Sequence, residues 1–322
     1  MPLPRPPLAL PALYAAGAAQ APEQHAACTA DPGTAPRGEL NAVRVAVATP
    51  GDTLDRLYEG PVWRDGALYL SDFVHHGTFP SRLRRFTPPD RWETVLDDSG
   101  SNGLALDVEG RLIAATHDRK QVARVNLDDG TRTPLVSTFD GAPFNSPNDL
   151  VMAADGTLYF TDPDYQRKAA PGGQPLTRVY RHREGVTTVV DDTLRNPNGI
   201  ALSPDGGTLY VAGGTADGDV LRAYPVVDGA PGAARDLARI SGGDGLAVDC
   251  LGNVYVTEHG EHRVRVFSPT GEVLATVRVD ANITNAAFGG TDRRTLFLTG
   301  AASLWSIDLD LAGLPDCPLE KN

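Results

Sequence analysis

The sequence has few cysteines, few cations and no long apolar run, and each shortage excludes a class of protein. Three cysteines in 322 residues are too few for a scaffold built on disulfides. The net charge of −12 argues against nucleic acid or an anionic membrane surface as a partner. No apolar stretch is long enough to cross a bilayer. The composition, 41% hydrophobic and 22% charged, is typical of a soluble globular protein.

Two catalytic signatures are also missing. The sequence has no Gly-x-Ser-x-Gly motif, so a Ser-His-Asp triad is not expected. The seven histidines show no paired spacing typical of zinc ligation. His75-His76 and His259–His262 lie in expected loops, where the simplest interpretation is solvation.

The first 21 residues have the features of an export signal. Arg5 precedes an apolar run from Leu8 to Ala19, and Ala19-Gln20-Ala21 fits a small-x-small cleavage site. The sequence therefore predicts a signal peptide over residues 1–21 and a periplasmic or secreted protein. A disordered Ala/Pro-rich tail is the alternative. Lipid attachment at Cys28 is a weaker alternative, because His25 stands where an aliphatic residue is wanted.

A repeat of six units dominates the rest of the chain. Each unit opens with a polar residue, followed by an apolar run, a turn that usually contains glycine, and a second apolar run rich in Val, Leu and Tyr. The opening residues are Glu59, Asn102, Asn148, Asn198, Asp244 and Asn285. Their spacings of 43, 46, 50, 46 and 41 residues match the length of a propeller blade. The fold class predicted is all-β, a six-bladed β-propeller.

The propeller is expected over residues 41–311, after a flexible lead-in at 22–40 and before a tail at 312–322. The last unit has only three evident strands, so the Val-rich segment Ala42–Ala48 is predicted to close it as an outer strand. Because a closed ring brings its ends together, a bridge between Cys28 and Cys317 is a hypothesis. Cys250 is expected to be an inert thiol in a turn between strands.

Equivalent residues on the innermost strands should meet around the central channel. The six opening residues would then place two carboxylates and four amides near one axis. All-oxygen ligands favour a hard cation, and Ca²⁺ best tolerates irregular spacing. One divalent cation is predicted, most readily Ca²⁺, with Mg²⁺, Mn²⁺ or Zn²⁺ as other candidates. The alternative is that Asn-Gly and Asp-Gly are simply turn formers.

The chain resembles the gluconolactonase and regucalcin (senescence marker protein) family of six-bladed propellers. The matching motifs lie between about Val43 and Leu309, and their order and spacing together are specific. They are Glu59–Trp63, Ser101–Leu104, Asn145–Leu150, Phe160–Pro163, Asn196–Gly199, Gly243–Leu246 and Thr284-Asn285.

The resemblance implies a metal held by Glu59, Asn198 and Asp244, with Asn148 completing the shell or contacting water or substrate. It also implies that Asp244 acts as the general base or the nucleophile. Some relatives carry a sugar-binding Arg two residues before the third-motif Asn. This chain has Ser146 there, so that contact cannot be transferred.

Four further residues are candidates for contacts with substrate or around the ion: Asn102, His117, Asp149 and Asp162. A role in a surface loop is the alternative for His117. The predicted function is metal-dependent hydrolysis of small sugar lactones, in which the cation polarises the carbonyl and Asp244 activates water. The alternatives are a phosphotriesterase at the same site, or a non-catalytic exported propeller that binds sugar or protein and keeps the metal for structure. The expected partner is a small lactone or ester, and the protein is expected to be a monomer or small homo-oligomer.

Overall fold

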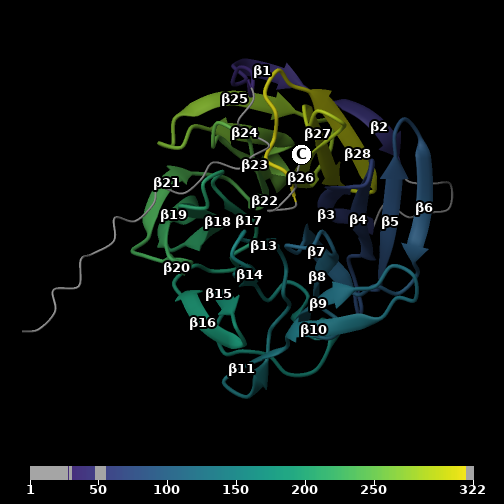
Figure 1. The fold of residues 1–322 in the computed structure, drawn as a ribbon, viewed down its shortest axis with the longest axis vertical. Coiled ribbons are helices and arrows are strands. Elements are labelled where there is room, and N and C mark those ends of the chain that lie inside the picture. The colour runs from purple at the N-terminus through teal and green to yellow at the C-terminus, as the bar shows by residue number, and fades with distance from the viewer. Residues whose placement is uncertain (1–27, 29–30, 48–55, 317–322) are drawn as a thin grey trace, which may run out of the picture.

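The computed structural model describes Cys28, residues 31–47 and residues 56–316. Six main sheets surround a central channel (Figure 1), which confirms the predicted six-bladed β-propeller. The predicted signal peptide at 1–21 lies outside the described residues, as do parts of the lead-in and of the C-terminal tail. Among the described residues, no helix has the length and apolarity needed to span a membrane.

Each blade is an antiparallel sheet whose strands follow one another along the chain, from the channel outwards. The first three blades consist of β3 (Arg56–Arg64), β4 (Ala67–Val74), β5 (Ser81–Thr87) and β6 (Arg91–Leu96); β7 (Ser101–Leu106), β8 (Leu112–Thr116), β9 (Gln121–Val125) and β10 (Arg132–Val136); and β13 (Leu150–Met152), β14 (Leu158–Asp162), β15 (Arg178–Arg183) and β16 (Val186–Asp191). Between the second and third lies a small hairpin, β11 (Thr138–Phe139) and β12 (Ala142–Pro143).

The last three blades follow the same plan. They consist of β17 (Ile200–Leu202), β18 (Thr208–Thr215), β19 (Gly218–Val227) and β21 (Arg235–Arg239), with β20 (Ala230–Pro231) at one end of β19; β22 (Gly243–Val248), β23 (Val254–Glu258), β24 (Arg263–Phe267) and β25 (Val273–Arg278); and β26 (Ile283–Gly289), β27 (Thr295–Gly300) and β28 (Ser303–Asp308). Two short 3₁₀ helices, η2 (Arg167–Ala169) and η3 (His259–Glu261), lie in loops.

An N-terminal strand completes the last blade, as predicted. β2 (Val43–Val47) pairs antiparallel with β28, and Val43 lies opposite Ser306. The preceding strand, β1 (Gly38–Asn41), pairs parallel with β25 and adds a fifth strand to the fifth blade. The sequence did not predict β1.

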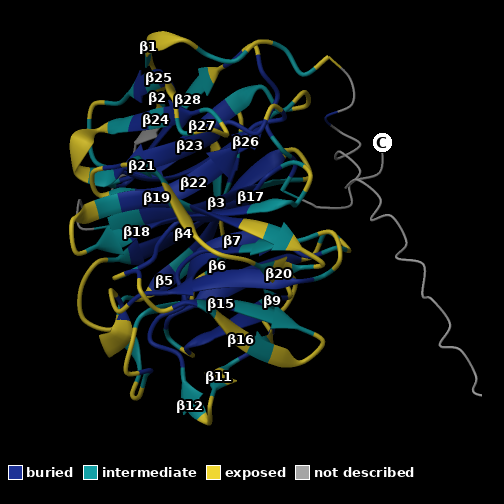
Figure 2. Cartoon of the chain, turned by 90° about the vertical axis from the view of Figure 1, so that its left-hand side faces the viewer, coloured by how far each residue is buried: buried dark blue, intermediate teal, exposed yellow. Residues whose placement is uncertain are grey.

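Apolar side chains pack between neighbouring blades. Between the fifth and sixth blades, the rings of Tyr255 and Phe288 lie 5.1 Å apart in an edge-to-face contact, and Trp305 is fully buried in the same cluster. Full burial of such a side chain contributes on the order of 1.5–3 kcal/mol. Figure 2 shows most of the inner strands as buried and the outer edges as partly exposed. These interfaces fix the angle between blades and hence the shape of the channel.

The disulfide differs from the one hypothesised. Cys28 bonds to Cys250, with Cα atoms 5.2 Å apart, and Cys317 lies outside the described residues. Cys250 is therefore not an inert thiol. The turn that contains Cys250 lies where the two ends of the chain cross, because its backbone N–H donates to the carbonyl of Ala312 at 2.9 Å. Ala312 and Leu314 pack against the disulfide.

Candidate functional site

The six opening residues of the repeat form what we call the central ring: Glu59, Asn102, Asn148, Asn198, Asp244 and Asn285. The glycine that follows four of them allows adjacent innermost strands to approach. The N–H of Gly199 donates to the carbonyl of Asp244 at 2.9 Å, and a Cβ on Gly199 would lie 2.2 Å from that oxygen. Gly103 has the same relationship to Asn148. These glycines serve close packing around the channel, which a turn-forming role does not explain.

Asp149 occupies the glycine position of the third blade and therefore carries a carboxyl group into the channel region. It is buried, and its Oδ1 accepts a 2.9 Å hydrogen bond from the N–H of Leu150. The exception in the repeat thus adds a third acid to the two that belong to the ring.

Pairs of ring side chains contact one another across blade boundaries. Nδ2 of Asn198 donates to Oδ1 of Asp244 at 2.7 Å, and Nδ2 of Asn285 donates to Oε2 of Glu59 at 3.3 Å. Glu59 is 6% exposed and Asp244 is 9% exposed. The structure therefore brings together carboxylates and amides from the first, fourth, fifth and sixth blades.

Burial and mutual repulsion oppose ionisation of these acids. Burial raises the pKa of Glu59 well above its usual range, and the nearby charge of Asp244 raises it further. Burial also raises the pKa of Asp244, against the lowering effect of His259 and Asn198. Burial raises the pKa of Asp149 to about 7, although hydrogen bonds from Leu150 and Asn285 oppose the shift. A positive charge at this place would relieve the repulsion among the three carboxylates.

The donor set fits a hard cation. All the available groups are carboxylate or amide oxygens, which suit Ca²⁺ or Mg²⁺ better than softer metals. Oδ1 of Asn102 is buried and accepts no hydrogen bond from the described part of the chain. No group of three or more His, Cys, Asp or Glu with metal-binding geometry occurs within residues 31–47 and 56–316 or at Cys28. A bound ion would therefore need amide oxygens, such as that of Asn198, besides the carboxylates.

The other predicted site residues take different places. Asn148 is buried in the ring, and its backbone N–H donates to the carbonyl of Thr161 at 2.9 Å. Nδ2 of Asn102 reaches Oε1 of Gln166 at 3.5 Å. Asp162 is fully buried and accepts the backbone N–H groups of Asn145 and Ser146 at 2.9 and 2.8 Å, so it organises a loop rather than facing the channel.

His117 begins the turn between β8 and β9, but its side chain is fully buried rather than solvated. Its Nε2 lies 2.7 Å from the carbonyl oxygen of Phe79, and its ring packs edge-on against Phe73 and Phe79. Burial lowers its pKa. A neutral imidazole that donates from Nε2 leaves Nδ1 as an acceptor, and Nδ1 has no partner among the described residues. His117 therefore supports the segment between β4 and β5.

Two residues beside the ring were not among the predicted site residues, although the segment from Asp162 to Tyr165 was expected at the mouth of the pocket. Nδ1 of His259 lies 3.4 Å from Oδ2 of Asp244, and this contact raises the pKa of His259. The simple solvation expected for His259 is therefore incomplete. Tyr165 is 44% exposed, and both burial of its hydroxyl and the charge of Asp244 raise its pKa. Its place directly after the Asp162-Pro163 motif was the only sequence signal.

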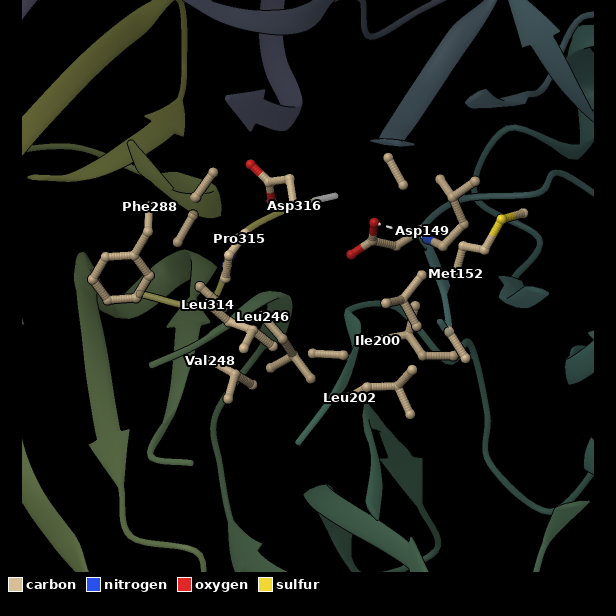
Figure 3. Close-up of a pocket in the computed structure, with 18 of the residues that line it drawn as sticks. Asp149, Met152, Ile200, Leu202, Leu246, Val248, Phe288, Leu314, Pro315 and Asp316 are labelled. Atoms are coloured by element: carbon tan, nitrogen blue, oxygen red, sulfur yellow. Dashed lines mark hydrogen bonds between the residues drawn. The ribbon is translucent and has the colours of Figure 1, made fainter. Parts of the chain in front are cut away.

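The channel widens beyond the ring into an apolar cavity of about 540 Å³. Asp149 and Asn285 mark the polar end, and residues further along the innermost strands provide the apolar wall. Figure 3 shows Ile200, Leu202, Leu246 and Val248 on this wall, and Asp149 and Asp316 as the acidic side chains drawn around the cavity. The C-terminal segment Leu314–Asp316 lines it as well, because the N–H of Leu314 donates to the carbonyl of Val248 at 3.0 Å. This apolar wall lies next to the ring carboxylates, where an apolar environment disfavours their charged form.

The fold and the site define a six-bladed β-propeller with a buried carboxylate and amide centre in its channel. A family model described as "SMP-30/Gluconolactonase/LRE-like region" matches residues 57–302, and the chain belongs to this family.

Known proteins similar to this chain include a curated relative and two solved structures. A 6-deoxy-6-sulfogluconolactonase of Pseudomonas putida is 32% identical over 255 residues, 76% of this chain and 83% of the relative. The structure of a gluconolactonase from Xanthomonas campestris has a TM-score of 0.70 at 30% identity, covering 86% of this chain and 99% of that one. A calcium-binding regucalcin from Agrobacterium tumefaciens has a TM-score of 0.70 at 21% identity, covering 86% and 97%, and shows the fold alone.

Proposed function

We propose that this protein hydrolyses sugar lactones at the central ring with the help of one divalent cation. The chain is a hydrolase of the lactonase type, in keeping with its family and with the gluconolactonase and sulfogluconolactonase that it resembles. The metal proposal rests on the burial of Glu59 and Asp244 beside Asn198, where no cationic side chain of the described residues contacts Glu59 directly. Ca²⁺ is the ion that this oxygen-rich set favours, ahead of Mg²⁺ or Mn²⁺.

Glu59, Asn198 and Asp244 would hold the cation, with Asn148 as a fourth contributor from the third blade of the ring. Asn198 would offer its amide oxygen to the ion while its Nδ2 keeps the 2.7 Å hydrogen bond to Asp244. A divalent cation here supplies positive charge that polarises a carbonyl oxygen and stabilises the oxyanion as it forms.

Asp244 is the base in this proposal. Water adds to the lactone carbonyl carbon while its proton passes to a carboxylate oxygen of Asp244. The ring C–O bond then breaks, and the proton moves on to the departing alkoxide, which leaves an open hydroxy acid. Asn198 fixes Oδ1 of Asp244 through its 2.7 Å hydrogen bond, while Oδ2 faces the partly exposed His259. The carboxylate therefore has a defined orientation before substrate arrives.

Chelation tests the proposal directly. Gluconolactone hydrolysis, followed as acid release with a pH dye, should disappear after EDTA treatment and return when Ca²⁺ is added to the dialysed protein. Metal content is measured in each sample, and thermal unfolding shows that the chelated protein is still folded. An undiminished rate in protein shown to be free of metal would refute the metal-dependent mechanism.

Two alternatives are decided in the same assay. An aryl phosphotriester in a parallel arm tests phosphoryl chemistry, since a polarising cation serves both ester classes. Thermal stabilisation by Ca²⁺ without turnover of either substrate would leave a sugar- or protein-binding propeller with a structural ion.

We also propose a periplasmic or secreted location. The Cys28–Cys250 disulfide supports it, because structural disulfides persist in oxidising compartments. Fractionation of cells that express the full chain should place the oxidised protein outside the cytosol. A cytosolic protein with both thiols free would refute this location.

A further inference from the structure

Lys120 is a buried cation that the proposed chemistry does not use. Its side chain sits in the hairpin between β8 and β9, the residue has a left-handed φ of 52°, and it is 2% exposed. Lysine is almost never fully buried without partners, because its ammonium group loses hydration. Here Nζ donates to the carbonyl oxygen of Asn145 at 2.5 Å and to that of Arg167 at 2.9 Å.

Those two carbonyls belong to different segments, which Lys120 joins. Asn145 lies before the third-blade ring residue, whereas Arg167 begins η2 in the loop that follows β14. We call residues 163–169 the Tyr165 loop. The ammonium group therefore connects the hairpin of the second blade with the Tyr165 loop of the third.

Further hydrogen bonds tie the same segments together. Oγ of Ser146 donates to the carbonyl of Pro163 at 2.7 Å and accepts from the N–H of Gln166 at 3.3 Å. The carboxylate of Asp162 accepts the N–H groups of Asn145 and Ser146. Hydrogen bonds to Ser146 and to Lys120 thus hold the Tyr165 loop in place.

Two side chains of the Tyr165 loop lie beside the central ring without belonging to it. Oε1 of Gln166 lies 3.5 Å from Nδ2 of Asn102. The hydroxyl of Tyr165 donates to the carbonyl of Asn196 at 3.4 Å, two residues before the ring residue Asn198, while 44% of Tyr165 remains exposed. An exposed aromatic side chain held this close to Asn198 offers an apolar face to the C–H side of a sugar.

We propose that Lys120 is a positioning residue that holds the Tyr165 loop in place, so that Tyr165 forms one wall of the lactone-binding site. This inference rests on the proposed lactonase function. Tyr165 acts by contact with the substrate, whereas Lys120 acts only through the loop. Removal of the ammonium group leaves the carbonyls of Asn145 and Arg167 without their shared donor, and the loop loses its anchor to the second blade.

The test compares Lys120→Met with Lys168→Met. Lys168 lies in the same loop but is exposed, so its variant is a matched control for loss of a lysine. Lys120→Met should raise KM for gluconolactone by about tenfold, with a smaller change in kcat, because a misplaced wall weakens substrate binding. Lys168→Met should leave both constants unchanged. An unchanged KM in folded Lys120→Met would overturn the proposal.

A double-mutant cycle separates positioning from general stability. If Lys120 acts through Tyr165, Lys120→Met should raise KM by much less in a Tyr165→Ala background than in the wild type. Equal effects in both backgrounds would assign Lys120 a purely structural role. If Lys120→Met does not fold, Ser146→Ala replaces it, because this change removes the hydrogen bonds of Ser146 to Pro163 and Gln166. Ser146→Ala should also raise KM. An unchanged KM in Ser146→Ala would count against the loop as a wall of the substrate site.

Hydrogen exchange distinguishes failure of this inference from failure of the proposed function. Amides of residues 164–169 should exchange faster in Lys120→Met than in wild type or Lys168→Met, whether or not any lactone is turned over. A wild-type protein without lactonase activity would refute the function and leave the exchange result standing. Unchanged exchange in the loop would refute the anchor itself.

Discussion

The side-chain amide of Asn198 donates a 2.7 Å hydrogen bond to Oδ1 of Asp244, which links the fourth and fifth blades at the channel. The other carboxylate oxygen faces Nδ1 of His259 at 3.4 Å. Both oxygens of Asp244 thus have protein neighbours, and its orientation does not depend on substrate. Such preorganisation is what a catalytic base requires, because no energy is then spent on orienting it during the reaction.

Asp244→Asn should abolish most turnover while the fold remains. A general base contributes about 10²- to 10⁴-fold in rate, so kcat should fall by at least about a hundredfold. Burial already disfavours the charged form of Asp244, so the neutral amide should leave the thermal midpoint of the metal-free protein unchanged or higher.

The control for Asp244→Asn is Asp217→Asn, whose side chain is 82% exposed. It should retain the wild-type rate. Near-normal kcat in Asp244→Asn would remove the base assignment, and a collapsed fold would show that the carboxylate has a structural role.

Gly199→Ala should disturb the ring without touching any polar side chain. The new Cβ would lie 2.2 Å from the carbonyl oxygen of Asp244, so the fourth and fifth innermost strands must separate. Overpacking of this kind costs about 1–3 kcal/mol of unfolding free energy, and the shift should also weaken Ca²⁺ affinity.

Gly260→Ala is the matched control, because no atom of the described residues beyond its chain neighbours lies within 4 Å of the place that the new Cβ would take. Denaturant unfolding and calcium titration of both variants check the prediction. Wild-type stability and Ca²⁺ affinity in Gly199→Ala would show that the strands tolerate separation at this level.

Asp162 makes stability depend on pH. Burial raises its pKa in the folded protein to about 7, above the value of about 3.9 in an unfolded chain. The unfolded chain therefore loses its proton first as pH rises, and the folded state loses stability between about pH 4 and pH 7, by about 4 kcal/mol in total for this group. The stability contribution is fully present below about pH 4.

Urea unfolding of metal-free protein at several pH values measures this loss. Asp149 has a pKa near 7 as well and titrates over the same range. Asp162→Asn should therefore reduce the fall in stability without abolishing it, because Asp149, Glu59 and Asp244 are buried acids whose pKa values are also raised. The quantity to compare is the slope of unfolding free energy against pH. The free energy itself falls at every pH in the variant, because Asn145 or Ser146 loses a hydrogen-bond acceptor. An identical slope in the variant would show that Asp162 does not titrate in this window.

Reduction of Cys28–Cys250 should lower stability but not activity. The disulfide joins residues 222 positions apart, and Cys250 follows the end of β22, whereas Asp244 lies near the start of that strand. Removal of a native disulfide costs about 2–5 kcal/mol of unfolding free energy. Cys250→Ser should lower the thermal midpoint and keep the kcat of the wild type at low temperature. Peptide mapping of the oxidised protein should recover the Cys28–Cys250 pair, and Cys317→Ser should have the wild-type midpoint. A peptide that links Cys28 to Cys317 would contradict this pairing.

The repeat made the propeller predictable because each blade reuses one pattern. The innermost strands are short and apolar and begin with a polar residue, so six registers could be recognised without coordinates. β2 was predictable for a related reason, since the last unit lacked one strand and Val43–Val47 had strand composition. β1 was not, because Gly38–Asn41 is mostly exposed and its parallel pairing with β25 depends on where the chain happens to pass.

In the candidate site, only the residues that belong to the repeat were predictable. Ring membership followed from register, but the contacts of His259, Tyr165 and Lys120 depend on loop shapes that local composition does not encode. His117 shows the same limit, because its burial depends on Phe73 and Phe79, which lie about forty residues earlier in the chain. The partner of Cys28 likewise depends on where the chain ends cross.

The pairing of β2 with β28 imposes an order on the synthesis of the molecule. Residues 43–47 are made long before their partner, Ser303–Asp308, because the other five blades lie between them in the sequence. The sixth blade therefore stays open until Ser303–Asp308 has been made, and pairing of such distant segments is slow. A product that ends before Ser303 would keep an unpaired edge on the N-terminal strand, a feature that favours aggregation or degradation. Only a chain that reaches β28 can close the circle.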